Sequence, residues 1–127
     1  MRTFVAAVLL AAAPVLAASP VLEDVSIRPG ARTVVSIRLS APAEFRTRTL
    51  EANGTAPHRL FLDLVGTSLA PTAPRMRDGA GALIRVRTGQ FDVATARVVL
   101  DLSGAVPFEV KAEGSVLKVT LSAAAER

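Results

Sequence analysis

The sequence contains no cysteine, no tryptophan and no tyrosine, and His58 is its only histidine. Without cysteine there can be no disulfide and no thiolate ligand for a metal ion. A catalytic zinc ion takes about three protein ligands, so one histidine does not make a zinc site. Large polar aromatic rings supply the usual rigid contact surface at binding sites, and their absence argues against strong sugar recognition by stacking. We therefore expect no metal site and no cofactor.

The motifs of common catalytic sites are missing as well. The chain has no G-x-S-x-G elbow, no phosphate-binding loop and no Cys/His pair. Asp63 and Asp101 each accompany an apolar triplet, and an acid–base pair is one interpretation of them. Structural roles in turns or beside arginines explain them better, and His58 is better explained as an ordinary hairpin residue. We expect no catalytic residues and no enzymatic activity.

The only long apolar run lies at the N-terminus, over residues 4–13. It follows Arg2, stops at Pro14 and is followed by a small-x-small cleavage site. These features predict a secretory signal peptide over residues 1–17, with cleavage after Ala18 as the alternative. The run is shorter than the roughly 20 residues that a membrane-spanning helix needs, and no later stretch is longer. We expect an exported protein with no transmembrane segment after cleavage.

The mature chain has the size and charge of one small basic domain. About 110 residues remain after cleavage, which is enough for a single domain with its own core. The whole chain carries a formal charge of +4 and has an isoelectric point near 11.0. A small exported domain without cysteine is more typical of the bacterial periplasm than of eukaryotic secretion, where disulfides are common. The expected anionic partners there are wall polymers, lipid head groups or acidic protein faces, and not nucleic acid.

Apolar and polar residues alternate with a period of two through much of the mature chain. Such alternation predicts strands that bury one side. No segment has a sustained helical period of apolar residues, so the predicted fold class is all-β. The apolar members of the clearest strands are Val35, Ile37 and Leu39; Leu60, Leu62 and Leu64; Val98, Leu100 and Leu102; and Leu117, Val119 and Leu121.

The strand pattern occurs twice, which indicates an internal repeat. The segment VSIRLSAPAEFR at 35–46 is similar to VVLDLSGAVPFE at 98–109. Each half has an apolar face that it cannot cover alone, so we expect each half to supply one sheet of a two-layer β-sandwich. The predicted organisation is a domain at residues 21–122, with half-repeats at 21–66 and 81–122, a proline-containing connector at 67–80 and a tail at 123–127.

Several segments resemble the AMIN domain. They are IRVRTGQF at 84–91, ARVVLDL at 96–102, PFEV at 107–110 and, in the first half, RLFLDLVG at 59–66. The resemblance covers residues 21–122. It implies a periplasmic β-sandwich of two similar sheets that binds peptidoglycan and localises envelope machinery at the division site or in a secretin complex. The implied partners are an N-acetylmuramoyl-L-alanine amidase, a type IV pilus secretin or another envelope protein. No amidase or secretin domain is present in this chain, so such cargo is either absent or binds non-covalently.

Arginines are the candidate binding residues. Peptidoglycan stem peptides carry carboxylates, and the planar guanidinium binds a carboxylate through two parallel charge-assisted hydrogen bonds. Arg85 and Arg87 lie two residues apart and therefore share one side of a strand, as do Arg46 and Arg48. The predicted peptidoglycan-binding residues are Arg38, Arg46, Arg48, Arg85, Arg87 and Arg97.

The sequence leaves alternatives open. Phe45 and Phe108 are expected in the core, so only Phe61 and Phe91 are expected at the surface. The arginines have a simpler explanation as charges that keep sheet edges soluble. A second function, from a different class, is that of a protein-interaction adaptor of a secretin or pilus assembly, whose strand edges accept a partner strand without touching the cell wall. A structural spacer is the third option.

Overall fold

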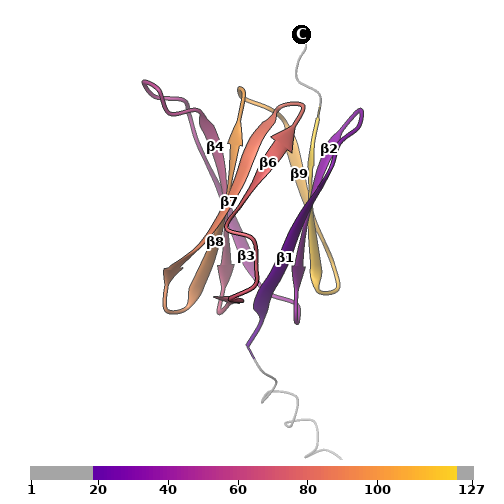
Figure 1. Ribbon diagram of the computed structural model, residues 1–127, viewed down its shortest axis with the longest axis vertical. Coiled ribbons are helices and arrows are strands. Elements are labelled where there is room, and N and C mark those ends of the chain that lie inside the picture. The colour runs from indigo at the N-terminus through magenta and orange to yellow at the C-terminus, as the bar shows by residue number, and fades with distance from the viewer. Residues whose placement is uncertain (1–18, 123–127) are drawn as a thin grey trace, which may run out of the picture.

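The computed structural model describes residues 19–122, and this part of the chain forms ten β-strands and no helix. The predicted signal peptide and the predicted tail at residues 123–127 lie outside the described residues. The strands form two five-stranded sheets that pack face to face (Figure 1). The predicted all-β two-sheet sandwich is therefore confirmed. Over residues 19–122 there is no helix long and apolar enough to cross a membrane.

All strand pairs are antiparallel except the pairing of the short edge strand β5 with β1. Sheet A has the order β5-β1-β2-β10-β9, and sheet B has the order β3-β4-β8-β7-β6. The strands of sheet A are β5 (Ser68–Leu69), β1 (Val21–Arg28), β2 (Thr33–Leu39), β10 (Val116–Leu121) and β9 (Phe108–Glu113). The strands of sheet B are β3 (Phe45–Leu50), β4 (His58–Val65), β8 (Thr95–Leu102), β7 (Leu83–Asp92) and β6 (Met76–Ala80).

Each half-repeat is divided between the two sheets, so the prediction that each half supplies its own sheet is wrong. In the first half, β1 and β2 lie in sheet A and β3 and β4 in sheet B; in the second half, β7 and β8 lie in sheet B and β9 and β10 in sheet A. Within the two half-repeats the chain changes sheets at residues 40–44 and 103–107, and between them it passes from β4 to β5 in sheet A and back to β6 in sheet B. The pairs β2–β10 and β4–β8 join the halves inside each sheet. Neither sheet exists without both halves. The segment at 67–80, predicted as a connector, contains β5 and β6.

The core lies between the sheets and consists of the predicted apolar residues. The inward side chains of β2, β4, β8 and β10 are all buried, which confirms the interpretation of their alternation. The β3–β4 hairpin has Gly54 at φ 61°, the left-handed conformation expected of the Asn53-Gly54 pair.

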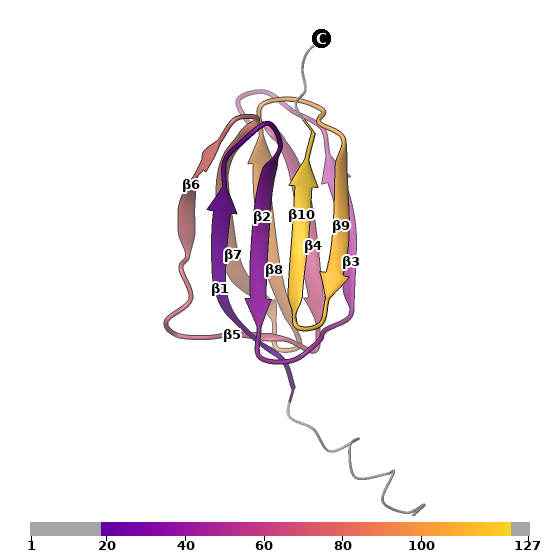
Figure 2. The ribbon, with the colours of Figure 1, turned by 90° about the vertical axis from the view of Figure 1, so that its right-hand side faces the viewer.

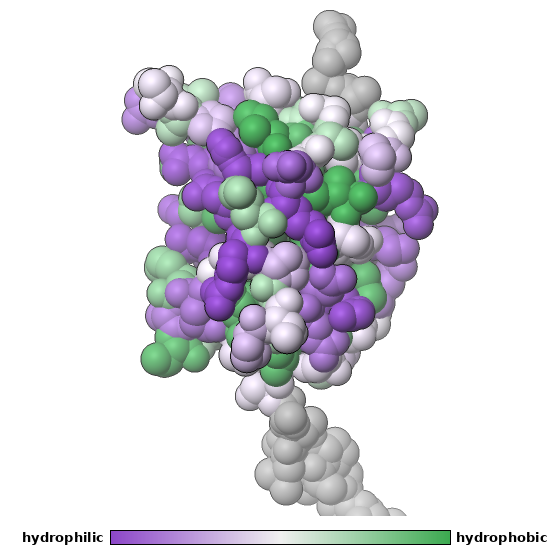
Figure 3. All heavy atoms as spheres, viewed as in Figure 1, coloured by the Kyte–Doolittle hydropathy of each residue, from purple (hydrophilic) through white to green (hydrophobic). Residues whose placement is uncertain are grey.

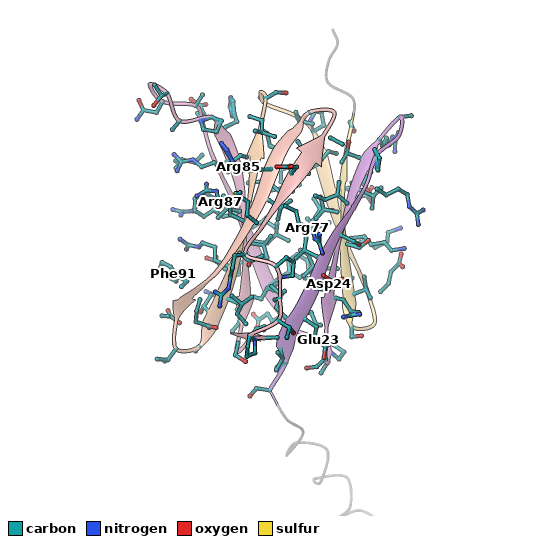
Figure 4. The ribbon with its side chains drawn as sticks, in the orientation of Figure 1. Glu23, Asp24, Arg77, Arg85, Arg87 and Phe91 are labelled. Carbon is teal, nitrogen blue, oxygen red and sulfur yellow. The ribbon has the colours of Figure 1, made fainter. Side chains whose placement is uncertain are left out.

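The two long sides of the sandwich differ. On one side β6 approaches β1, and Arg77 of β6 donates a hydrogen bond to the Val25 carbonyl and pairs with Asp24 at 3.3 Å (Figure 4). Hydrophilic residues lie among hydrophobic ones on this side (Figure 3). On the opposite side lie the edge strands β3 and β9 (Figure 2), which are exposed apart from half-buried Phe45 and Val110. The sandwich is therefore bridged along one side and open along the other.

Candidate functional site

The outer side of sheet B carries six arginines, which we call the arginine face. Strand register brings them together across β3, β4, β8 and β7. Arg46 lies opposite Asp63, which lies opposite Arg97, and Arg59 lies opposite Asp101, which lies opposite Arg85. Figure 4 shows Arg85, Arg87 and Phe91 on the side of sheet B that points away from sheet A. The members of the arginine face are Arg46, Arg48, Arg59, Arg85, Arg87 and Arg97.

The two outer sides of the sandwich differ in charge. On sheet B, six arginines stand with four aspartates, which leaves a formal charge of +2; the aspartates are Asp63, Asp78, Asp92 and Asp101. On sheet A, the strands carry four basic and four acidic residues on the outer side: Arg28, Arg38, Lys111 and Lys118 with Glu23, Asp24, Glu109 and Glu113, of which Asp24 also pairs with Arg77 of β6. Only two of those four cations are arginines. Sheet B therefore has both the excess charge and the planar donors.

A buried carboxylate positions two members of the arginine face. The Asp101 side chain is 2% exposed, although it lies on the outer side of the sheet, because Arg85 and Arg87 cover it. Arg87 donates two hydrogen bonds to Asp101, both at 2.9 Å, and Arg85 donates one at 3.2 Å. An arginine has five N–H donors, so both guanidinium groups keep donors that can point toward solvent or a ligand.

Arg97 is held by a second ion pair and by two rings. It donates to the two carboxylate oxygens of Asp63 at 2.7 and 3.0 Å. Its guanidinium lies 3.7 Å from the centre of the Phe91 ring and 4.9 Å from that of Phe61, within the range of cation–π attraction. The hydrogen bonds to Asp63 raise the pKa of the Arg97 guanidinium above its ordinary value.

The other three arginines have no acidic partner among residues 19–122. Arg46 and Arg48 are exposed on the edge strand β3, and Arg48 lies 4.9 Å from the centre of the Phe61 ring. Arg59 has its Nε atom buried without a hydrogen-bond acceptor. These three side chains, together with the one excess charge of the two arginines that share Asp101, are the positive charges of the face that no ion pair neutralises.

A hollow of about 210 Å³ opens between the two positioned arginine clusters. Arg87, Phe91 and Arg97 line it, together with Gly89 and Val99. Gly89 leaves the space open because it has no side chain, and a Cβ atom built there would meet no other atom within 4 Å. The hollow therefore places guanidinium donors beside a space that a small acidic group can enter.

The structure brings five of the six predicted arginines together and separates the sixth. Arg38 lies on the outer side of sheet A and pairs with Glu23 at 3.6 Å. Arg59 was missed, although the sequence contains the signal for it. It alternates with Leu60 and has the same parity as Asp63, so it must share the outer side of β4.

Two of the expectations about large apolar side chains are wrong. Phe61 is only 9% exposed, because the arginine side chains beside it cover its ring. Phe108, expected in the core, is 36% exposed because β9 is an edge strand on the open side. Ile84 is exposed as well, since it occupies a bulge in β7 and leaves the alternation with Val86. Phe91 is exposed as predicted and is 57% accessible.

The two aspartates singled out in the sequence have arginine partners, which confirms that interpretation of them. Asp63 pairs with Arg97, and Asp101 pairs with Arg85 and Arg87. His58 lines a separate hollow of about 310 Å³ at one end of the open side. Residues 19–122 contain no cluster of three or more histidine and acidic side chains arranged to hold a metal ion.

The fold and the arginine face define a β-sandwich binding module with one cationic outer side. The AMIN domain family matches residues 24–121, and the chain belongs to this family. AMIN domains are non-catalytic targeting modules of the bacterial periplasm that associate with peptidoglycan in envelope proteins. A search of curated proteins finds no match to the chain.

Proposed function

We propose that the arginine face binds peptidoglycan through the carboxylates of its stem peptides. The observation that carries this proposal is the gathering of six arginines on one outer side of the sandwich, with a formal charge of +2, while the other outer side is balanced. Guanidinium groups suit carboxylates because their donors form a planar fork. A face several strands wide also suits an extended polymer.

The internal ion pairs support this function because they hold the guanidinium donors in place before a ligand binds. Asp101 holds Arg85 and Arg87, and Asp63 holds Arg97, before any ligand arrives. Immobilising a flexible side chain on binding costs about 0.5–1.5 kcal/mol, and that cost is reduced when the side chain is already ordered. The hollow over Gly89 is the place where one acidic group fits between two held guanidinium groups.

The repeating nature of the wall favours a weak site with several contacts. Successive stem peptides of one polymer can engage different arginines, and each later contact is effectively intramolecular. We propose that the protein acts in the periplasm, with its arginine face on the wall and an amidase, a secretin or another envelope protein as its cargo. The remaining surface, including the balanced outer side of sheet A, is then free for that cargo.

The test is co-sedimentation of the mature chain with purified peptidoglycan sacculi at low and at physiological salt. Two double variants remove the same net charge from opposite sides. Arg46→Gln with Arg48→Gln alters the arginine face, and Arg28→Gln with Arg38→Gln alters sheet A. Arg46 and Arg48 are preferable to Arg85 and Arg87, because loss of the latter pair would leave Asp101 buried without a partner.

We expect wild-type binding that weakens with salt, since the screening length falls from about 30 Å at 0.01 M to about 8 Å at 0.15 M. The Arg46/Arg48 variant should bind about fivefold more weakly, equal to 1 kcal/mol, and the Arg28/Arg38 variant should match the wild type. Equal losses in both variants would mean that only net charge matters, which contradicts a specific face. A folded wild type that stays in the supernatant at both salts would refute wall binding altogether.

A further inference from the structure

The two sheets have four edge strands, β5 and β9 in sheet A and β3 and β6 in sheet B. Three of them are covered by other residues, very short or of mixed charge. β5 has only two residues, and the Gln90 side chain bonds to the Leu69 amide and the Thr67 carbonyl beside it. β6 is tied to β1 through Arg77. β9 is longer but alternates charge along its outer side, with Lys111 between two glutamates. Such features are the usual protection of sheet edges against further pairing.

The edge strand β3 is neither covered nor short, its charges are of one sign only, and it has free backbone groups. The Val65 amide donates to the Glu44 carbonyl, which fixes the phase of the β3–β4 ladder. Along an antiparallel edge strand, the backbone groups of successive residues point alternately toward the neighbouring strand and away from it. The amides and carbonyls of Phe45, Thr47 and Thr49 therefore point away from β4, into the open side of the sandwich. The free amides and carbonyls of these three residues are enough to pair with an added strand.

The side chains of β3 select for an acidic partner. Arg46 and Arg48 project on the outer side and have no acidic partner among the described residues. Residues directly opposite across two strands lie about 4.5–5.5 Å apart at Cβ, so acidic side chains on an added strand would pair with both arginines. β3 of a second copy would oppose arginine to arginine, and β9 of a second copy would bring Lys111 against one of them.

The inner side of an added strand would meet a hollow of mixed lining, in which Val106 and Phe108 are apolar and Glu51, His58 and Arg59 are polar. Thr49 and Phe108 line the same hollow of about 310 Å³ at one end of the open side. The Phe108 side chain is 36% exposed there. Apolar residues that alternate with the acidic ones would face this hollow.

We propose that β3 is a docking edge for an extended segment of a partner protein in which acidic and apolar residues alternate. The segment adds to sheet B as an antiparallel strand, the slightly more stable arrangement per residue. Its acidic side chains lie against Arg46 and Arg48, and its apolar residues exchange hydrogen bonds with the outward groups of Thr47 and Thr49. This mode of strand addition uses backbone bonds for affinity and alternate side chains for selectivity. It assigns cargo binding to the backbone edge of β3, which wall binding does not use, although the side chains of Arg46 and Arg48 are shared with the arginine face.

The experiment titrates the mature chain with a ten-residue peptide of alternating glutamate and valine, followed by amide hydrogen exchange. We expect exchange at Thr47 and Thr49 to slow about tenfold or more at saturation. Thr49→Pro removes one outward amide without breaking the β4 ladder, and should weaken binding by about tenfold. Ala112→Pro, at the equivalent place on β9, is the matched control and should leave binding unchanged.

Modified peptides test the proposal without changing the protein. N-methylation of the valines removes the donors that face β3 and should abolish binding, while N-methylation of the glutamates should preserve it. A lysine–valine peptide should not bind. The proposal is overturned if no glutamate–valine binding occurs, if the two methylated peptides bind alike, or if the two proline variants lose affinity equally.

The same variants separate this inference from the proposed function. Sacculi binding by Thr49→Pro should equal that of the wild type, because all six arginines remain. Loss of sacculi binding in that variant, with peptide binding retained, would assign the edge to the wall and overturn the proposed protein partner. Failure of wall binding alone leaves the peptide result to stand by itself.

Discussion

Substitution of Asp101 by asparagine separates two explanations of the arginine face. If the face attracts ligands only through its charge, removal of a buried carboxylate raises the charge from +2 to +3 and strengthens binding. If the face works because its guanidinium groups are held in place, the same change weakens binding. Asp101 is the suitable position because it holds two arginines and is itself out of reach of a ligand, at 2% exposure.

The cost to stability follows from the contacts of Asp101. Asparagine keeps the shape and one acceptor oxygen, but its amide group turns donors toward the donors of Arg85 and Arg87. Of the three hydrogen bonds at 2.9, 2.9 and 3.2 Å, the substitution removes at least one, because one carboxylate oxygen accepts two of them and the other oxygen accepts the third. Because both arginines can return to solvent, we expect a loss of about 2–3 kcal/mol, below the usual range for a broken buried pair. At about 4 °C per kcal/mol for a domain of this size, the melting temperature falls by 8–12 °C.

The effect on binding is the difference between two terms. Two arginines that must be ordered by the ligand cost about 1–3 kcal/mol. One added surface charge contributes below about 1 kcal/mol. With about 2 kcal/mol for the ordering and at most about 1 kcal/mol for the charge, the net loss is about 1 kcal/mol or more, which corresponds to binding that is about fivefold weaker or more. The measurement is co-sedimentation with sacculi well below the melting temperature, with circular dichroism to confirm the fold.

Asp78→Asn is the matched control. Asp78 lies on the same outer side, on the exposed strand β6, and forms no ion pair with any residue in 19–122. Its substitution adds the same charge without releasing an arginine, so it should leave binding equal or slightly stronger. If Asp101→Asn also binds sacculi more strongly than the wild type, then ordering of the guanidinium groups by Asp101 does not contribute to binding.

Two further variants test neighbouring features. Gly89→Leu places a side chain in the hollow beside Arg87, at a position where a Cβ atom has no neighbour within 4 Å. We expect an unchanged melting temperature and about fivefold weaker sacculi binding. Sacculi binding equal to that of the wild type would show that the hollow is not part of the site. Arg77→Ala cuts the tie between β6 and β1; because Arg77 is half exposed, urea denaturation should show a loss of about 1 kcal/mol, with faster amide exchange in β6. Unchanged exchange would mean that pairing with β7 alone holds β6.

The alternation in the sequence predicted the core because burial of one side of a strand is a local property. Leu60, Leu62 and Leu64 are inward in any sandwich that buries β4. Strand partners are not local in this sense. That β2 pairs with β10 and β4 with β8 depends on where the chain changes sheets, and the corners at 40–44 and 103–107 do not reveal which sheet comes next.

The candidate site was predictable as a set of outward arginines but not as a cluster. Parity along each strand gave the orientation of Arg85 and Arg87, and it also contained the missed Arg59. Only the pairing order could tell that Arg38 lies on the opposite sheet from the others. The burial of Phe61 depends on arginines from neighbouring strands, so no pattern within β4 could indicate it.

The internal repeat itself separates structural from functional positions. β2 and β8 occupy equivalent places in the two halves, and their inward apolar triplets match closely. Their outward residues do not match: Asp101 stands where the first half has Arg38, and Arg97 stands where it has Val34. Folding requires the inner side of both sheets to stay apolar but places no such demand on the outer sides. The two sheets are therefore alike where they face each other and different on their outer sides. That difference gives one domain two distinct outer surfaces, a cationic one suited to an anionic polymer and a balanced one that need not compete with it.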